Sequence, residues 1–180
     1  MPSPQFPPEY AWLATVKSPE ILMQAIALYG VREKPGADNS PVILAWAKEL
    51  GGAAGNWYNS DDKAWCGLFA AICAKRAGFI PPDGFSALRA RDWAKWGNPV
   101  SGKAGIGDVL VFERTGGGHV GFYVAEDATC YHVLGGNQSD MVRVSRIEKS
   151  RLVAARRSPG TTNARQNIVT ASGQISKNEA

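Results

Sequence analysis

The chain has 180 residues, of which 44% are hydrophobic and 20% are charged, a size and balance typical of one folded domain. Its net charge of +4 is too small and too dispersed to indicate a nucleic-acid-binding protein. The sequence contains no apolar run near the roughly 20 residues that cross a bilayer, which argues against stable membrane insertion.

The start of the chain and its cysteines indicate where the protein is made. The opening MPSPQFPPEY lacks the basic start and apolar middle of a secretory signal, so we expect synthesis in the cytoplasm without a signal peptide. Cys66, Cys73 and Cys130 are an odd number of cysteines without CxxC spacing, which disfavours a disulfide framework or a four-cysteine zinc site. The three thiols are expected to stay free.

Both ends of the chain are predicted to be poorly ordered. The first eight residues are rich in proline and residues 158–180 are polar, so neither stretch offers enough apolar surface to offset the entropy of ordering it. We therefore expect an N-terminal extension over residues 1–19, one folded domain over 20–157 and a flexible C-terminal tail over 158–180.

Four segments in the first half of the domain are predicted to be helical. They cover residues 19–30, 40–52, 66–78 and 86–97, and each ends at a glycine that suits a helix C-terminus.

From Gly107 the hydrophobic period changes to that of short strands. The runs cover residues 107–114, 119–126, 130–136, 141–147 and 151–157, with Gly, Asn and Asp turns between them. Helices first and strands second predict an α+β fold, in which N-terminal helices pack on one side of a C-terminal antiparallel β-sheet.

The helix that starts near Cys66 has two interpretations. Its small and apolar positions recur at helical spacing, so both Cys66 and Cys73 fit a buried stripe, and we accept this for Cys73. Cys66 differs because it lies in the first turn, where unpaired backbone N–H groups and the helix dipole favour an anion and lower a thiol pKa. Cys66 is therefore a candidate nucleophile.

A cysteine nucleophile needs a base, and the chain has two histidines. His119 opens a strand directly after three glycines, and Gly121 leaves space beside it, so we select it as the base. His132 lies between apolar neighbours and is interpreted as a packing or surface residue. Zinc held by both histidines and Cys130 lacks any metal-binding spacing.

A third polar group would fix the tautomer of the base. Asn137 follows the strand after His119, and a hairpin pairing of the two strands would bring its amide beside the ring. Gln138 and Asp140 are neighbours that could replace it. On its own, Asn137 fits equally well as a turn residue.

Two further features fit mainly structural roles. Trp93 and Trp96 are spaced to pack a helix onto the body, although one could line a sugar or peptide groove. Residues 143–157 hold six basic residues against Glu148, and we interpret this basic cluster as a solvated face, with an anion-binding surface as the alternative. Its members are Arg143, Arg146, Lys149, Arg151, Arg156 and Arg157.

The motifs, taken in order, resemble a known group of enzymes. WCGLFA, ARDWAKWG, GDVLVFER, GGGHVGFYV and LGGNQSDMVRVSRI resemble the CHAP and NlpC-type cysteine peptidases and amidases of cell-wall turnover, in a branch common in phages and prophages. The similarity extends from Ile21 to Arg157. One departure is Trp65, because many CHAP enzymes have a glutamine before the cysteine. The side-chain donor of the oxyanion hole is thus unassigned, with Asp61 and Asp62 nearby.

This resemblance implies a papain-like fold and an endolysin-like hydrolase that cleaves an amide bond in peptidoglycan. Cys66 would be the nucleophile, His119 the general base and then acid, and Asn137 the orienting group. The resemblance implies no metal or organic cofactor, peptidoglycan as the partner, a monomer, and action on the cell wall or periplasm after release.

Two alternatives remain at this point. An interbacterial amidase toxin of the same superfamily would share the chemistry, and its genomic neighbours would include an immunity protein rather than a holin. A catalytically inert virion or binding domain would keep the fold, and its Cys66 thiol would react with iodoacetamide no faster than a free peptide thiol.

Overall fold

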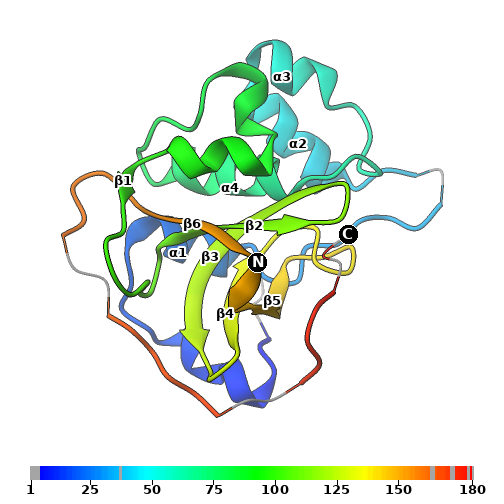
Figure 1. Ribbon diagram of the computed structural model, residues 1–180. Coiled ribbons are helices and arrows are strands. Elements are labelled where there is room, and N and C mark those ends of the chain that lie inside the picture. Colours follow the sequence, from blue (N-terminus) through cyan, green and yellow to red (C-terminus); the bar gives the residue numbers. More distant parts are fainter. Residues whose placement is uncertain (1–4, 37, 163–164, 171–172, 178, 180) are drawn as a thin grey trace.

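The structure, a computed structural model, is an α+β fold, as the sequence predicts (Figure 1). It describes residues 5–36, 38–162, 165–170, 173–177 and 179. Helices from the first half of the chain pack on an antiparallel sheet from the second half. Within the described residues, no helix has the length and apolar character that crossing a bilayer requires.

The helices lie mostly before residue 96. The α-helices are α1 (Glu20–Ala27), α2 (Pro41–Leu50), α3 (Gly52–Trp57) and α4 (Cys66–Arg76). The 3-10 helices are η1 (Pro8–Ala14), η2 (Gly84–Ala87), η3 (Ala90–Lys95) and η4 (Lys149–Arg151).

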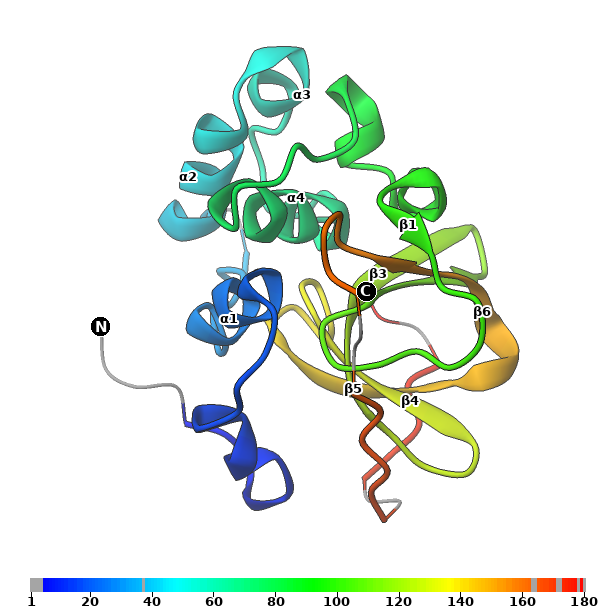
Figure 2. The ribbon, with the colours of Figure 1, turned by 90° about the vertical axis from the view of Figure 1, so that its left-hand side faces the viewer.

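One six-stranded sheet carries the second half of the chain. Its strands are β1 (Asn98–Pro99), β2 (Val109–Arg114), β3 (Gly117–Glu126), β4 (Cys130–Gly135), β5 (Arg143–Glu148) and β6 (Leu152–Arg157). Their order is β1-β6-β2-β3-β4-β5, and every neighbouring pair is antiparallel. Figure 2 shows that the sheet curves and that α2, α3 and α4 gather on one side of it.

The segment 86–97 differs from its prediction as one α-helix. It forms part of η2 and then η3, with Leu88 and Arg89 between them. This break lets the backbone of Leu88 pass against α4, where a Cβ on Gly67 would lie only 2.3 Å from the Leu88 carbonyl oxygen. Tertiary contact therefore overrides the helical spacing of the tryptophans.

Helix α4 is buried on every side rather than along one stripe. All residues from Cys66 to Ala74 are buried, because the helix lies between α2 and the sheet (Figure 1). Phe69 contacts Phe122 of β3 with ring centroids 6.0 Å apart and Trp46 of α2 at the same spacing. A helix apolar all round its circumference is expected at such a central position.

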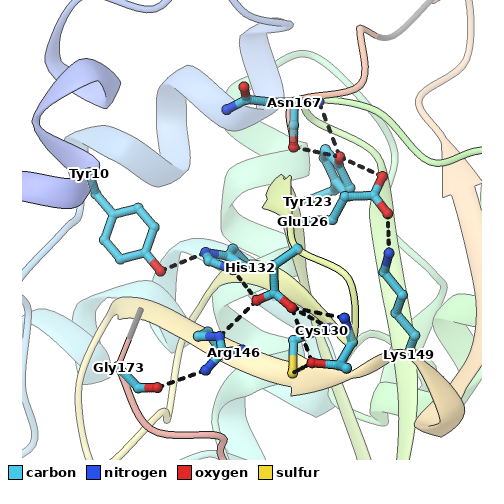
Figure 3. Close-up of polar contacts among 11 residues, drawn as sticks. Tyr10, Tyr123, Glu126, Cys130, His132, Arg146, Lys149, Asn167 and Gly173 are labelled. Carbon is cyan, nitrogen blue, oxygen red and sulfur yellow. Dashed lines mark hydrogen bonds and ion pairs between the residues drawn. The ribbon is translucent and has the colours of Figure 1, made fainter. Parts of the chain in front are cut away.

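The N-terminal extension is attached to the sheet by a buried polar network (Figure 3). The hydroxyl of Tyr10 in η1 lies 2.7 Å from His132 Nδ1, and His132 Nε2 lies 2.8 Å from Asp127. Arg146 donates to the same carboxylate at 2.8 Å. His132 is fully buried and thus a packing residue. The extension is packed here, because Tyr10 and Leu13 are also buried.

Parts of the predicted flexible tail run along the sheet. Asn167 accepts a hydrogen bond from the Glu126 backbone at 2.8 Å, and its own carbonyl and amide contact the Tyr123 hydroxyl (Figure 3). The backbone N–H of Ser176 donates to Arg146 of β5 at 2.8 Å. Residues 163–164, 171–172, 178 and 180 of that tail lie outside the described residues.

Candidate active site

Cys66 is the first residue of α4, as the sequence predicts. Its neighbour Gly67 allows the close approach of Leu88, so the start of the helix faces the loop between η2 and η3. The thiol is buried, with 5% of the residue exposed.

Opposing effects act on the Cys66 thiol. Burial is the largest and raises the pKa of the thiol above its usual value. The backbone N–H groups of Val120, Gly67 and Cys66 itself, together with the Arg114 charge, act in the opposite direction. The resting cysteine is therefore a neutral thiol, and the donors that would stabilise its thiolate surround it.

His119 lies near the start of β3, where the glycine turn before it is fixed by two arginines. Arg91 donates to the Gly117 carbonyl at 3.0 Å, and Arg114 donates to the Gly118 carbonyl at 3.3 Å. A Cβ on Gly118 would lie 2.8 Å from the side chain of Arg91. Glycine is needed there because the arginine packs directly on the turn.

Gln138 is the residue that contacts the His119 ring, with Oε1 3.0 Å from Nε2. Asn137, the predicted orienting group, is buried beside it with φ at +56°. Among the described residues, no hydrogen bond joins its side chain to His119. Ser139 and Asp140 also have positive φ, at +52° and +59°. This turn directs the side chain of Gln138 toward the imidazole.

The contacts of Gln138 determine the tautomer of His119. The Gln138 amide nitrogen donates to the backbone carbonyls of Val133, at 3.1 Å, and Arg143, at 2.5 Å. Two acceptors at the NH2 end leave the amide oxygen facing the ring, so Nε2 must carry the proton. Nδ1 then has the free lone pair that a general base requires.

Two consecutive glycines show how close the start of α4 lies to His119. A Cβ on Gly136 would be 2.7 Å from the Trp65 ring, and a Cβ on Gly135 would be 3.0 Å from His119 Nε2. Neighbouring residues at the end of β4 thus contact the helix start on one side and the imidazole on the other.

His119 is 1% exposed, and this burial lowers the pKa of its imidazole to about 4. The Glu179 charge and the Gln138 hydrogen bond act to raise the pKa, while the charges of Arg114 and Arg151 act to lower it. At neutral pH the site therefore holds a thiol and a neutral imidazole, both shielded from solvent.

The residues before Cys66 have structural partners. Asp61 accepts hydrogen bonds from the backbone N–H groups of Ser40, at 2.7 Å, and Lys34, at 3.1 Å. Trp65 donates from its indole nitrogen to Glu33 at 2.5 Å. The side chain of Asp61 thus holds the 34–40 loop, and the donors at the sulfur are the backbone N–H groups of Val120, Gly67 and Cys66.

A groove of about 510 Å3 opens beside the start of α4. Its lining consists of Trp57, Lys63, Ala64, Phe85, Leu88 and Arg89. Trp57 and Phe85 are 51% and 40% exposed and pack edge to face with centroids 6.0 Å apart. Lys63 lies 4.1 Å from the centre of the Trp57 ring.

Sequence reasoning missed this groove because it considered other tryptophans. Trp93 and Trp96 are buried, with indole nitrogens bonded to the carbonyls of Ala87 and Ile80. They pack η3 onto the body, as their spacing predicts. The exposure of Trp57 follows from how α3 lies against η2, and no periodicity in the sequence indicates it.

The basic cluster is largely neutralised within the molecule. Arg146 pairs with Asp127, Lys149 with Glu126, Arg151 with Glu179, and Arg157 with Asp108. Arg156 donates to the carbonyls of Trp96 and Gly97. Most of the basic residues therefore bind other segments of the protein. This differs from both the solvated face and the anion-binding surface considered above.

Comparison with known protein families gave no matching family model, and a search of curated proteins found no similar sequence. A function for the protein is therefore inferred from the motifs and from the geometry of Cys66, His119 and Gln138.

Proposed function

We propose that the protein is a papain-like cysteine hydrolase that cleaves an amide bond in bacterial peptidoglycan. Cys66 is the nucleophile and His119 the general base and then acid. Gln138 takes the orienting role that the sequence analysis gave to Asn137. Peptidoglycan is the partner, and the protein acts on the cell wall or periplasm after release from the cytoplasm.

The contact between Gln138 and the His119 ring is the single observation that carries this proposal. Gln138 holds the proton on Nε2, so Nδ1 is the basic nitrogen, and Nδ1 is the ring nitrogen nearer the backbone. The backbone N–H of Val120, the next residue, approaches the Cys66 thiol. A thiol at that N–H is favourably situated to give its proton to Nδ1.

The reaction would then proceed in two halves. Nδ1 of His119 takes the thiol proton, the sulfur of Cys66 attacks the amide carbonyl, and backbone N–H groups at the start of α4 stabilise the oxyanion. The protonated imidazole gives its proton to the leaving amine. Water, deprotonated by His119, attacks the thioester and releases the acid and the free thiol.

The groove beside α4 supports a peptide-linked sugar polymer as the substrate. Exposed Trp57 and Phe85 offer apolar faces on which sugar rings or peptide groups stack. Lys63 and Arg89 add positive charge for the acidic groups of such a polymer. Leu88 both lines this groove and packs against Gly67, which connects the groove to the nucleophile.

Mass spectrometry of fragments released from purified cell walls tests the proposal. We expect the protein to release new amine and carboxyl ends at one type of amide bond, and Cys66→Ala to release none while keeping its circular dichroism spectrum. Cys73→Ala is the matched control and should remain active, because Cys73 is also buried in α4 but lies about two turns after Cys66. Activity that survives in Cys66→Ala would contradict the proposal.

Burial of the site favours one other function, a catalytically inert binding domain with the same fold. The raised pKa of the Cys66 thiol predicts slow alkylation by iodoacetamide for a closed enzyme and an inert domain alike. Thiol reactivity therefore does not separate them, and the wall fragments do: intact walls after incubation with the folded protein would favour the inert domain.

A further inference from the structure

A buried ion pair joins the C-terminal segment to the sheet. Arg151 in η4 donates from Nη1 and Nη2 to the two carboxylate oxygens of Glu179 at 2.8 and 2.7 Å. Glu179 is only 1% exposed. In this bidentate geometry a guanidinium recognises a carboxylate with high specificity.

The pair lies near His119, because Arg151 bonds to Glu113 of β2, and Glu113 pairs with Gly118, the residue before His119 in β3. Burial dominates the pKa of the imidazole, but the charge of Glu179 raises that pKa and the charge of Arg151 lowers it. A carboxylate supplied by the chain itself is thus held beside the proposed base.

Arg151 is also held by a strand of the sheet. Its Nε donates to the backbone carbonyl of Glu113 in β2 at 3.0 Å. This bond leaves Nη1 and Nη2 directed at the Glu179 carboxylate, and Nη1 also donates to the Ser176 carbonyl of the same segment at 3.2 Å. The same two nitrogens would receive another carboxylate without rearrangement, since the guanidinium is held by a strand of the sheet.

The segment that carries Glu179 is held by polar contacts and little apolar burial. Ser176 donates its backbone N–H to the Arg146 carbonyl at 2.8 Å, and Arg146 donates to the Gly173 carbonyl at 2.7 Å (Figure 3). Between this segment and β5 lies a cavity of about 220 Å3. Segments with few apolar contacts open at low free-energy cost.

We propose that Arg151 forms a carboxylate-binding subsite beside His119, which recognises a free carboxylate of the substrate's stem peptide and which Glu179 of the same chain occupies in this structure. The inference rests on the proposed function, because peptidoglycan stem peptides carry free carboxylates close to their amide bonds. Glu179 acts as an intramolecular competitor, and the substrate displaces the segment around Ser176 when it binds.

Binding in the absence of turnover tests this subsite. In full-length Cys66→Ala protein, calorimetry measures the affinity for N-acetyl-L-alanyl-γ-D-glutamyl-L-lysine and for its analogue with the glutamyl α-carboxylate converted to a carboxamide. We expect Glu179→Gln to bind the carboxylate peptide about tenfold or more tightly than its parent, because an internal competitor is removed. Glu20→Gln, which removes an exposed carboxylate on α1, should not change the affinity.

Two further arms complete the test. The double variant Arg151→Gln, Glu179→Gln should not show this increase in affinity. The carboxamide peptide should bind no variant more tightly than the parent. Equal affinity of Glu179→Gln and its parent, or equal gains for both peptides, would overturn the proposal.

Hydrogen exchange keeps the proposal testable if Glu179→Gln does not fold. In the Cys66→Ala parent, saturating carboxylate peptide should accelerate exchange of the Ser176 amide, and unchanged exchange would overturn the displacement. Because neither readout requires hydrolysis, peptide binding without wall cleavage would count against the proposed function alone. Wall cleavage without this binding would count against the subsite alone.

Discussion

At the scale of single residues, the candidate site depends on one amide. Gln138 contacts His119 through its oxygen because its nitrogen is occupied by the carbonyls of Val133 and Arg143. Asn137 has the same functional group one residue earlier, yet its left-handed backbone conformation places it elsewhere in the turn. The function of a polar residue in a turn thus depends on the local backbone more than on its chemistry.

The first prediction separates these two amides. We expect Gln138→Ala to lower kcat roughly tenfold or more, because the imidazole loses the group that fixes its tautomer. The hydrogen bond that His119 donates to Gln138 acts to raise the pKa of the imidazole, so its loss should also move the acid limb of the kcat/KM profile to lower pH. A pH series of wall-cleavage rates measures both effects.

Asn137→Gly is the control, since glycine keeps the positive φ while it removes the amide. This variant should leave kcat unchanged, and the acid limb of its kcat/KM profile should stay at the same pH. A loss of kcat as large in Asn137→Gly as in Gln138→Ala, with the same displacement of the acid limb, would return the orienting role to Asn137.

At the scale of elements, α4 is fixed by close contacts at glycines. The carbonyl of Leu88 approaches Gly67 on one side, and Gly136 approaches the Trp65 ring and the Cβ atom of Phe69 on another. These contacts define the position of the Cys66 end of the helix relative to β4 and the η2–η3 loop. The break in the predicted 86–97 helix is part of the same arrangement, because a continuous helix would not present the Leu88 carbonyl there.

The second prediction follows from this packing. Gly67→Ala should destabilise the protein by about 1 to 3 kcal/mol, because the new methyl group meets backbone that cannot rotate away. Urea unfolding followed by tryptophan fluorescence measures the change. Gly117→Ala is the control, since its Cβ would have no neighbour closer than 3.9 Å and should leave the free energy of unfolding nearly unchanged. Equal stability of the two variants would contradict the close approach of Leu88.

At the scale of the whole molecule, buried polar groups attach both ends of the chain to the sheet. Tyr10 of η1 contacts His132 of β4, whose ring also contacts Asp127, and Arg151 holds the C-terminal segment through Glu179. Burial acts to raise the pKa of Asp127, but hydrogen bonds from Arg146 and His132 outweigh it and hold that pKa well below its usual value. Stability should therefore depend strongly on pH.

The third prediction concerns acid. Burial lowers the pKa of His119 to about 4, so the unfolded chain binds more protons than the folded one between pH 6.5 and 4. The free energy of unfolding should thus fall as pH falls through that range, by on the order of 3 kcal/mol from His119. The lowered pKa of Asp127 predicts a further loss below about pH 4.

Urea unfolding at pH 7, 5 and 4 measures this dependence. His119→Gln, which removes the titrating group, should weaken the dependence between pH 7 and 5. An identical pH dependence in His119→Gln and the natural chain would show that His119 does not titrate with a lowered pKa.

The amino-acid sequence by itself determined the fold class, most strand positions, the helix start at Cys66 and the packing role of His132. These features depend on periodicity, on glycine positions and on residue type, which are local properties of the chain. Only the tertiary structure decided that Gln138 contacts the imidazole, that Trp57 rather than Trp93 lines a groove, and that Glu179 pairs with Arg151. Each of these depends on which distant segments meet, and long-range packing and the direction of a turn leave no periodic signal in the sequence.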